Sequence, residues 1–355
     1  MTVVVNTKAS PISSDLLGKV EWVDIDIARS INIVKDATAL WKLFLRFRQD
    51  RFDIVHSVTP KAGLLGMLAA MLARTPIRIH TFTGQVWATK RGHMRVLLRC
   101  LDRVLAHCAT ALLVDSHSQL VFLESEKIAK HDQMHVLGSG SISGVETAKF
   151  KPDALARENI RSQHGIPLNA LVLLYVGRMH PEKGVIELVQ AFLILSNSHP
   201  EIHLMLVGPD EGVLHKVHNI DGSLHSRIHI VGLTAEPEKY MAAADIFCLT
   251  SYREGFGLSL IEAAATGLPC VASRIYGVSD AVVDGVGGLL VNVKDVKALV
   301  GALKTLAEQP LLRMQMGADA RSRATKEFSQ DAVVGAWLDF YQLQLLRTSS
   351  NDKHS

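Results

Sequence analysis

The stretch REGFGLSLIEAAATGLP, residues 253–269, carries two glutamates, Glu254 and Glu262, with seven residues between them. Two glycines flank Phe256, and glycine lets a backbone approach a ligand closely. A helix that begins near Leu258 would aim free N–H groups and its positive dipole end at a phosphate. Glu262 would lie about one turn into that helix. Carboxylates accept hydrogen bonds from paired hydroxyls, so the two glutamates suit a sugar or a ribose better than a phosphate.

Two cations follow an earlier apolar stretch, in the sequence YVGRMHPEKG at residues 175–184. Ligands of open α/β sheets bind beyond the carboxyl ends of the strands, which is where Arg178 and Lys183 would stand. Arg178 can make a forked contact with a diphosphate, and Lys183 can act as a point charge. By themselves the two residues also fit a pair of solvated loop charges. The glutamate-bearing stretch favours the ligand reading, because it follows another strand at the same edge.

The second half of the chain alternates short aliphatic runs with helical patterns. Strands that are apolar almost throughout are typical of a parallel sheet covered by helices on both faces, which predicts a doubly wound α/β domain. The predicted strands are 171–177, 202–208, 228–232, 245–251 and 269–273. The predicted helices are 185–195, 237–244 and 258–267.

The first half follows the same plan less regularly. Its predicted strands are 20–24, 53–58, 77–80 and 110–116, and its helical patterns run at about 33–49, 63–73, 89–106 and 117–129. The Gly- and Ser-rich stretch at 138–153 is the expected join between two domains. We therefore expect an N-terminal domain over 1–147 and a C-terminal domain over 148–328. A final helix over 329–347 would pack back across the join, and 348–355 would form a disordered tail.

The cysteines, the first residues and the apolar runs of the chain indicate which class of protein it belongs to. The 355 residues include four cysteines without a C-x-x-C pair, and the first residues lack the charged head and apolar core of a signal peptide. The longest uncharged apolar run, residues 62–73, is too short to span a bilayer. These features predict buried, reduced thiols in a cytoplasmic protein. No recognised nucleic-acid-binding motif accompanies the basic residues, so no nucleic-acid partner is expected.

The two charged motifs together carry a resemblance. GRMHPEKG, followed some seventy residues later by EGFGLSLIEAAATGLPCVAS, resembles the signature of the family-four retaining glycosyltransferases, which have the GT-B fold. HTFTGQVWATKRG, residues 80–92, is similar to the branch that assembles bacterial surface polysaccharides on lipid carriers. The resemblance covers about residues 53–345. It implies an α/β architecture of two Rossmann-like, doubly wound parallel-sheet domains that face a cleft.

The resemblance also implies roles for residues of this chain. Arg178 and Lys183 would bind the diphosphate of a nucleotide sugar, with Glu254 on the transferred sugar as the third catalytic residue. Glu262 would hold the ribose. The rest of the donor pocket would consist of Gly208, Leu233, Thr234, Gly255, Phe256, Gly257 and Leu258. Enzymes of this family use no metal, and two cations with a helix dipole can stabilise the charge that grows on a departing diphosphate.

The implied reaction moves a hexose or N-acetylhexosamine from a nucleotide diphosphate, with UDP the expected nucleotide, and retains anomeric configuration. The implied acceptor is a polyprenyl-diphosphate-linked saccharide of O-antigen, capsule or exopolysaccharide synthesis. A hydrolase would need carboxylates on both sides of the scissile bond, whereas both glutamates here are assigned to the donor. A sugar-nucleotide epimerase of the same fold and an inactive binding subunit stay open as alternatives.

The acceptor side is expected in the first half of the chain. Lys61 follows a predicted strand and could meet an acceptor phosphate, while His80 and Thr83 end the next strand. Many relatives place a histidine where Thr83 stands, and His80 could substitute for it. Relatives also open with a strand, a glycine-rich loop and a helix, but only about twenty residues precede 20–24 here. This first unit is therefore expected to be missing.

A basic excess marks the first half, since residues 35–103 hold 13 Lys and Arg against 4 Asp and Glu. The helical segments 41–51 and 87–99 mix aromatics with these basic side chains. Such helices can lie on an anionic membrane, although a core face with a solvated basic face would give the same pattern. Peripheral contact with the inner face of the cell membrane is the corresponding expectation.

Overall fold

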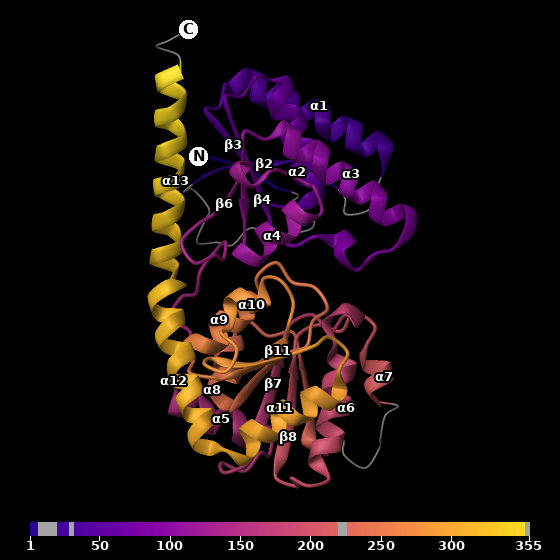
Figure 1. The fold of residues 1–355 in the computed structure, drawn as a ribbon, viewed down its shortest axis with the longest axis vertical. Coiled ribbons are helices and arrows are strands. Elements are labelled where there is room, and N and C mark those ends of the chain that lie inside the picture. The colour runs from indigo at the N-terminus through magenta and orange to yellow at the C-terminus, as the bar shows by residue number, and fades with distance from the viewer. Residues whose placement is uncertain (6–19, 28–31, 219–225, 352–355) are drawn as a thin grey trace. The chain divides into compact units, whose positions relative to one another are not determined.

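The computed structural model describes residues 1–5, 20–27, 32–218 and 226–351, and every structural statement below concerns these residues. The chain divides into two compact units, which are described separately (Figure 1). Unit 1 comprises Met1–Val114, Leu123–His135 and Asp339–Ser355. Unit 2 comprises Asp115–Phe122 and Val136–Leu338.

Unit 2 contains a six-stranded sheet in the order β12-β11-β10-β7-β8-β9, and all its neighbouring strands are parallel. Its strands are β7 (Leu171–Val176), β8 (Ile202–Val207), β9 (Ile228–Gly232), β10 (Ile246–Leu249), β11 (Cys270–Ser273) and β12 (Gly288–Val291). The five strands predicted for this half are confirmed, and β12 is an additional one.

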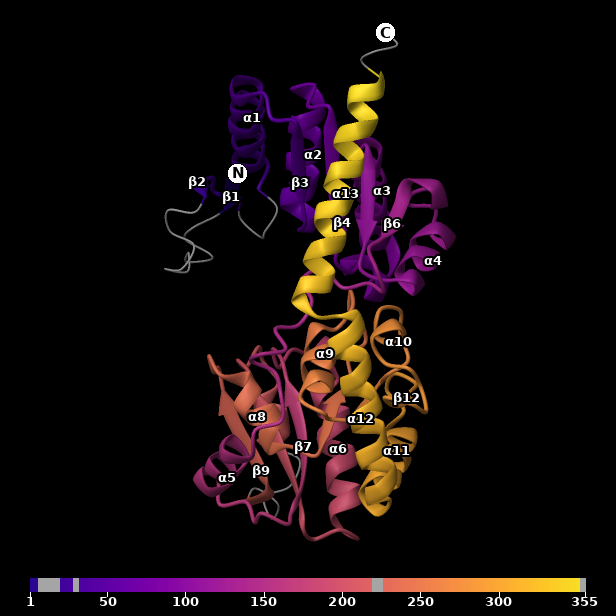
Figure 2. The ribbon, with the colours of Figure 1, turned by 90° about the vertical axis from the view of Figure 1, so that its left-hand side faces the viewer.

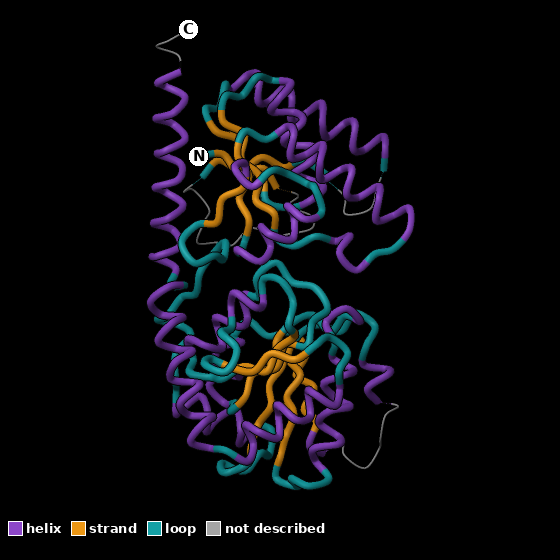
Figure 3. The backbone as a smooth tube through the Cα atoms, viewed as in Figure 1, coloured by secondary structure: helices purple, strands orange, loops and turns teal. Residues whose placement is uncertain are grey.

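Helices cover both faces of this sheet (Figure 3). They are α5 (Ala154–Gln163), η4 (Pro181–Lys183), α6 (Val185–Ser196), α7 (Leu214–His218), α8 (Pro237–Ala243), α9 (Leu258–Ala265), α10 (Val278–Ala281), α11 (Val296–Glu308) and α12 (Pro310–Glu327). One group consists of α6 packed against α11, and the other consists of α9 packed against α8 and α12, with α5 against α8. This two-faced cover explains why the strands are almost wholly apolar.

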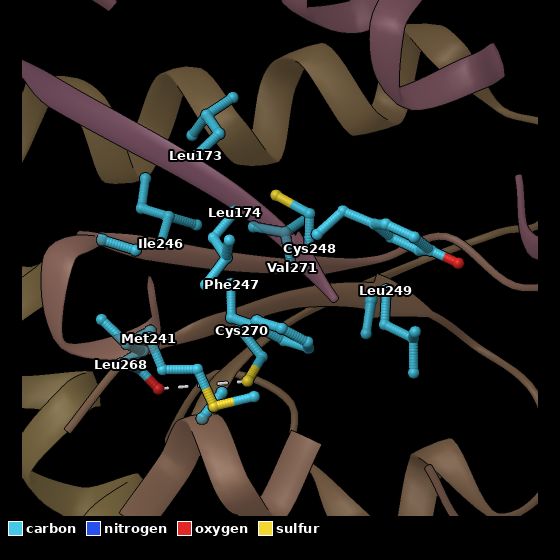
Figure 4. Close-up of a cluster of buried hydrophobic side chains, with 14 of the residues drawn as sticks. Leu173, Leu174, Met241, Ile246, Phe247, Cys248, Leu249, Leu268, Cys270 and Val271 are labelled. Carbon is cyan, nitrogen blue, oxygen red and sulfur yellow. Dashed lines mark hydrogen bonds between the residues drawn. The ribbon is translucent and has the colours of Figure 1, made fainter. Parts of the chain in front are cut away.

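The core of unit 2 lies where β7, β10 and β11 run side by side (Figure 4). Leu173 and Leu174 of β7 pair with Ile246 and Phe247 of β10, and all four side chains are fully buried. Cys248 and Cys270 are free thiols within this core, and burial raises the pKa of both. Cys108 is also buried, whereas Cys100 is exposed, so the prediction of buried thiols is wrong for Cys100.

The strand order reverses at the centre of the sheet. From β7 the chain proceeds outward through β8 and β9, and it then returns to place β10 on the other side of β7. The carboxyl ends of two such strands, from which the connections leave in opposite directions, form the usual ligand crevice of a doubly wound sheet. The loops after β7 and β10 are those that carry Arg178, Lys183 and Glu254.

Unit 1 is built on a four-stranded sheet in the order β3-β4-β5-β6. The strands are β3 (Ile54–Ser57), β4 (Ile77–Phe82), β5 (Ala111–Val114) and β6 (Met134–Val136). The helical elements are α1 (Ile33–Asp50), α2 (Pro60–Leu72), η2 (Val86–Thr89), α3 (Gly92–Cys108) and η3 (His131–Gln133). The helix α4 (His117–Ser125) has residues in both units. In both views α2 lies between α1 and the sheet strand β4, and it contacts α1, α3, β3 and β4 (Figure 2).

A separate parallel pair precedes this sheet, formed by β1 (Thr2–Val5) and β2 (Glu21–Asp24). The sequence pattern identified β2 but no strand before it, and it led to the expectation that the opening strand-loop-helix unit is missing. A strand is nevertheless present at Thr2–Val5. The segment between the two strands, 6–19, lies outside the described residues.

The last helix, α13 (Gln330–Asn351), has residues in both units. Trp337 donates a hydrogen bond from Nε1 to the carbonyl of Ile142 at 3.0 Å within unit 2. Tyr341 lies 2.6 Å, Oη to Nδ1, from His56 of β3 within unit 1. Among the described helices, none combines the length and apolar character needed to cross a bilayer.

Candidate functional site

The loop after β7 is tied to the end of β10. Gly184 has a φ of +66°, and a Cβ built on it would lie 2.1 Å from the carbonyl oxygen of Thr250. Thr250 in turn donates its hydroxyl to the carbonyl of Gly184 at 2.8 Å. Because the two backbones touch here, only glycine fits at position 184. The contact fixes Lys183, the preceding residue, beside the loop that follows β10.

Lys183 and Glu254 form an ion pair, with Nζ 2.6 Å from Oε1. Their side chains are 20% and 14% exposed, so the pair is largely shielded from water but not enclosed. The two residues are 71 positions apart, and the adjacent strands β7 and β10 bring them together. A cation that meets a carboxylate at the carboxyl edge of the sheet can hold a phosphate and a sugar hydroxyl side by side.

Arg178 is held by a residue that the sequence analysis did not select. Its Nη1 donates to both carboxylate oxygens of Glu211, at 2.9 and 2.8 Å. Glu211 stands in the loop after β8, so its position after a predicted strand was the available signal. The Arg178 side chain remains 55% exposed and can therefore reach a ligand.

Tyr175 holds the backbone of Arg178 through a hydrogen bond. This last buried residue of β7 donates its hydroxyl to the carbonyl of Arg178 at 2.8 Å. Burial raises the pKa of Tyr175, and the negative charge of Glu254 raises it further. Tyr175 is therefore a neutral donor that fixes the backbone turn carrying Arg178.

Gly208 follows the last residue of β8 and contacts Gly177 after β7 and Gly232 at the end of β9. Its φ is +135°, and a Cβ built there would lie 1.9 Å from the carbonyl oxygen of Gly177. Its N–H donates to the carbonyl of Gly232 at 2.8 Å, and the N–H of Gly177 donates to Val207 at 2.9 Å. Gly208 thus lies at the carboxyl edge of the sheet, at the position expected of a pocket floor.

The stretch after β10 turns sharply into α9, which begins at Leu258 as predicted. Gly257 is the residue before the helix, with a φ of +89°, and no side chain caps this helix end. A Cβ on Gly277 would lie 2.0 Å from the carbonyl oxygen of Gly255, so the loop is pressed against a second backbone. Phe256 is buried and meets the ring of Phe328 edge-on at 5.2 Å. Phe256 is therefore an anchor of the loop.

Glu262 lies in the second turn of α9 and is half-buried. Burial raises its pKa to about 7, the negative charge of Glu238 raises it as well, and the positive charge of Lys149 lowers it. Lys149 and Glu238 are an ion pair at 3.5 Å, which the sequence analysis did not associate with this site. Glu262 is thus poised between a hydrogen-bond donor and an acceptor near neutral pH.

Leu233 and Thr234 follow β9 directly. The Leu233 side chain is 81% exposed, so the part of this residue that can line a pocket in a fixed position is its backbone. Thr234 accepts a hydrogen bond at its hydroxyl from the N–H of Glu236 at 3.1 Å, which shapes the turn. Both residues stand at the same carboxyl edge of the sheet as Gly208.

The three residues predicted for the acceptor side lie in unit 1. Lys61, near the start of α2, pairs with Asp36 at 2.6 Å. His80 is 1% exposed inside β4, lies 2.8 Å from the hydroxyl of Ser57, and has its pKa lowered to about 3 by burial. It is a neutral residue of the sheet. Thr83 follows the last residue of β4 at the carboxyl edge.

Two family models match the chain. A glycosyl transferase 4-like domain matches residues 5–140, and the glycosyl transferases group 1 model matches residues 156–323. A similar protein of Staphylococcus aureus is described as a capsular polysaccharide biosynthesis glycosyltransferase, CapM; it is 30% identical over 315 residues, which cover 87% of this chain and 81% of the relative.

A protein of Escherichia coli is 28% identical over 321 residues, 89% of this chain and 81% of its own length. It is described as a UDP-Gal:alpha-D-GlcNAc-diphosphoundecaprenol alpha-1,3-galactosyltransferase. Among solved structures, Anabaena Alr3699/HepE in complex with UDP-glucose has a TM-score of 0.76 at 22% identity, covering 95% of this chain and 88% of that one. Sucrose-phosphate synthase from Thermosynechococcus elongatus has a TM-score of 0.75 at 24% identity, covering 92% and 84%.

Proposed function

Since this chain belongs to the group 1 family of glycosyltransferases, we propose that it moves a sugar from a UDP-linked donor onto a lipid-linked saccharide, with retention of anomeric configuration. The predicted family and the predicted GT-B fold are both confirmed. The E. coli relative, whose name includes UDP-Gal and a diphosphoundecaprenol acceptor, supports the donor and acceptor classes of the proposal. The S. aureus relative supports a role in surface polysaccharide synthesis.

The observation that carries the donor assignment is the ion pair of Lys183 with Glu254 at the reversal of strand order. Arg178 stands in the same loop as Lys183, after β7. Two cations at this edge can neutralise a diphosphate, Arg178 through its exposed guanidinium and Lys183 through its ammonium. Glu254, held by Lys183 at 2.6 Å, would accept hydrogen bonds from hydroxyls of the transferred sugar. Glu262 in its ionised form would accept hydrogen bonds from the ribose.

The chemistry follows from where charge develops. As the bond between the anomeric carbon and the phosphate oxygen breaks, negative charge grows on the diphosphate, and the two cations and the uncapped start of α9 stabilise it. The acceptor hydroxyl forms the new bond on the same face, and its proton passes to a donor phosphate oxygen. Neither glutamate acts as nucleophile or acid, and no metal enters the proposed reaction.

The acceptor would meet unit 1 through the residues after β3 and β4, where Lys61 and Thr83 stand. The basic helical segments 41–51 and 87–99 would hold the protein at the inner face of the cell membrane, where a lipid-linked acceptor is found. Consistent with an interfacial role, Trp41 of α1 and Met94 of α3 are exposed among basic side chains.

The test is incubation of the protein with a panel of UDP- and GDP-sugars and a membrane lipid extract, with separate assays for transfer to lipid and for nucleotide release. Transfer from one UDP-sugar is the expected result. Conversion of a nucleotide sugar without an acceptor would identify an epimerase instead. Binding without turnover for every donor, in an extract that a related transferase can glycosylate, would point to an inactive subunit.

A further inference from the structure

A second, basic pocket lies on unit 1, apart from every residue assigned to donor or acceptor. Its volume is about 530 Å³, it is open to solvent, and it is lined by the last turns of α3 and by residues from the end of α4 to the start of β6. Its charged and titratable lining consists of Arg103, His107, Glu124, Lys127, Lys130 and His131. Because cations outnumber the one carboxylate, the pocket attracts an anion.

The chain path places this pocket at the opposite edge of the sheet from the acceptor side. Since α3 follows β4 and precedes β5, its last turn lies beside the amino end of β5, and Gln133 of the lining directly precedes β6. Lys61 and Thr83 follow the carboxyl ends of β3 and β4. Substrates of α/β sheets bind at the carboxyl ends, so the basic pocket is a separate site.

Arg103 is already fixed in position. Its Nε donates to the carbonyl of Lys127 at 2.8 Å, and its Nη2 donates to the carbonyl of Glu126 at 3.1 Å. These contacts use main-chain oxygens, so they leave the positive charge without a carboxylate. Over the described part of the chain, Nη1 of Arg103 makes no hydrogen bond and is available to a ligand.

The two lysines of the lining also lack a carboxylate partner among the described residues. Glu124, the one carboxylate of the lining, lies 3.2 Å from the Nδ1 atom of His131. Neither Lys127 nor Lys130 has an acidic partner within ion-pair distance among the residues that the structure describes. The lining therefore includes two lysines and a pre-positioned arginine that have no carboxylate at ion-pair distance in the described part of the chain.

Lys127 also occupies a position that disfavours a lysine. Its φ is +55°, its N–H donates to Glu124 and the next N–H donates to Leu123, which is the glycine-type ending of a helix. A glycine would avoid the strain of a left-handed residue, which costs roughly 1 kcal/mol.

From this arrangement we propose that the basic pocket binds a phosphate-bearing anion through Arg103, Lys127 and Lys130. Phosphate chemistry of this kind is presented both by free phosphorylated metabolites and by lipid headgroups. The proposal stands on unit 1 alone and holds whether or not the proposed transfer reaction is correct.

The matched variants are Lys127→Gly and Arg74→Gly. Arg74 has a φ of +61° and ends α2 with the same pattern of two hydrogen bonds, from Arg74 to Met71 and from Thr75 to Ala70, but it does not line the pocket. Both variants remove one cation and relieve the same backbone strain. Lys130→Gln is a third variant that leaves the left-handed position unchanged.

The measurement is calorimetric titration of the full chain with inorganic pyrophosphate, with UDP present at saturation to occupy the donor site. The Kd is expected to rise about tenfold in Lys127→Gly and in Lys130→Gln, since each loses one charge-assisted contact, and to stay unchanged in Arg74→Gly. Co-sedimentation with phosphatidylcholine vesicles, with and without phosphatidylglycerol, is the second measurement.

Loss of pyrophosphate binding in the two pocket variants supports the proposal with a free phosphate as ligand. Selective loss of binding to phosphatidylglycerol vesicles supports it with a lipid headgroup as ligand. Binding of neither probe by the unmodified chain would overturn the proposal, as would equal weakening in Arg74→Gly, because the effect would then be one of net charge.

Discussion

Arg178 donates from one guanidinium nitrogen to both carboxylate oxygens of Glu211, at 2.9 and 2.8 Å, across the loops that follow β7 and β8. The guanidinium that a donor diphosphate would bind is therefore already paired with a carboxylate. The side chains are 55% and 33% exposed, so the pair contributes little to stability and can be displaced. In the proposed reaction, Glu211 would compete with the donor diphosphate for Arg178.

Glu211→Gln is accordingly expected to bind UDP about two- to fivefold more tightly than the unmodified protein, because an exposed ion pair contributes up to about 1 kcal/mol. Calorimetric titration with UDP measures the change. Glu308→Gln, which removes a surface carboxylate at the end of α11, is the control for net charge and should leave the Kd unchanged. Weaker binding by Glu211→Gln would mean that the carboxylate positions Arg178.

Glu254 and Lys183 form one ion pair but are expected to respond differently to substitution. Lys183→Gln should weaken the binding of both UDP and the UDP-sugar by about tenfold, since it removes a charge-assisted contact with the diphosphate. Glu254→Gln should leave the Kd for UDP nearly unchanged and lower the transfer rate by at least about tenfold. Titration with each ligand and a transfer assay separate the two effects. If Glu254→Gln weakened the binding of UDP as strongly as that of the UDP-sugar, Glu254 would not act on the transferred sugar.

Gly208→Ala is expected to lower the free energy of unfolding by about 3 kcal/mol or more, since the new Cβ would lie 1.9 Å from the carbonyl oxygen of Gly177. Gly232→Ala is the matched control. Gly232 ends the neighbouring strand with a φ of +78°, and its Cβ would meet nothing within 4 Å, so only the conformational cost of about 1 kcal/mol applies. Chemical denaturation gives both values. Equal losses in the two variants would show that steric contact is not the cause.

Glu262 gives the protein a predictable pH dependence. Its pKa is raised from 4.5 to about 7 by burial, so the folded state binds the proton more tightly than the unfolded state does. Its contribution to stability is therefore complete below about pH 4.5 and is lost as the pH rises to 7. Glu262→Gln should be more stable than the unmodified protein by about 3 kcal/mol above pH 7 and equally stable near pH 4.

The same titration should control donor binding. Only the ionised carboxylate accepts hydrogen bonds from two ribose hydroxyls, so the affinity for UDP is expected to rise as the pH increases through 7. Glu262→Gln should bind UDP more weakly at pH 8 and lose this pH dependence. Denaturation and titration at several pH values measure the two effects. A stability difference that is constant with pH would contradict the raised pKa.

Much of the secondary structure could be predicted from short stretches of the sequence. The strand β7 is apolar in all six positions, and the start of α9 at Leu258 follows from a glycine before a helix-forming run. The strand β12 was not identified because GLLV is short and follows a glycine-rich turn. At Thr2–Val5 a threonine and three valines are too short a run to distinguish a strand from a loop.

The site was harder to predict where distant residues set its properties. The strand alternation placed Arg178, Lys183 and Glu254 at one edge, because the carboxyl ends of parallel strands coincide there. The pairing of Arg178 with Glu211 depends on which strands are neighbours, and the raised pKa of Glu262 depends on how deeply α9 is packed. Neither property can be read from the residues near each side chain in the sequence.

The central position of β7 has a consequence for synthesis of the protein. A ribosome releases β7, β8 and β9 before β10, so one edge of β7 has no partner until about seventy further residues have emerged. An unpaired apolar strand edge invites association with other chains. A nucleotide bound as proposed could not protect the nascent domain during this interval, because Lys183 and Glu254 meet only when β10 pairs with β7.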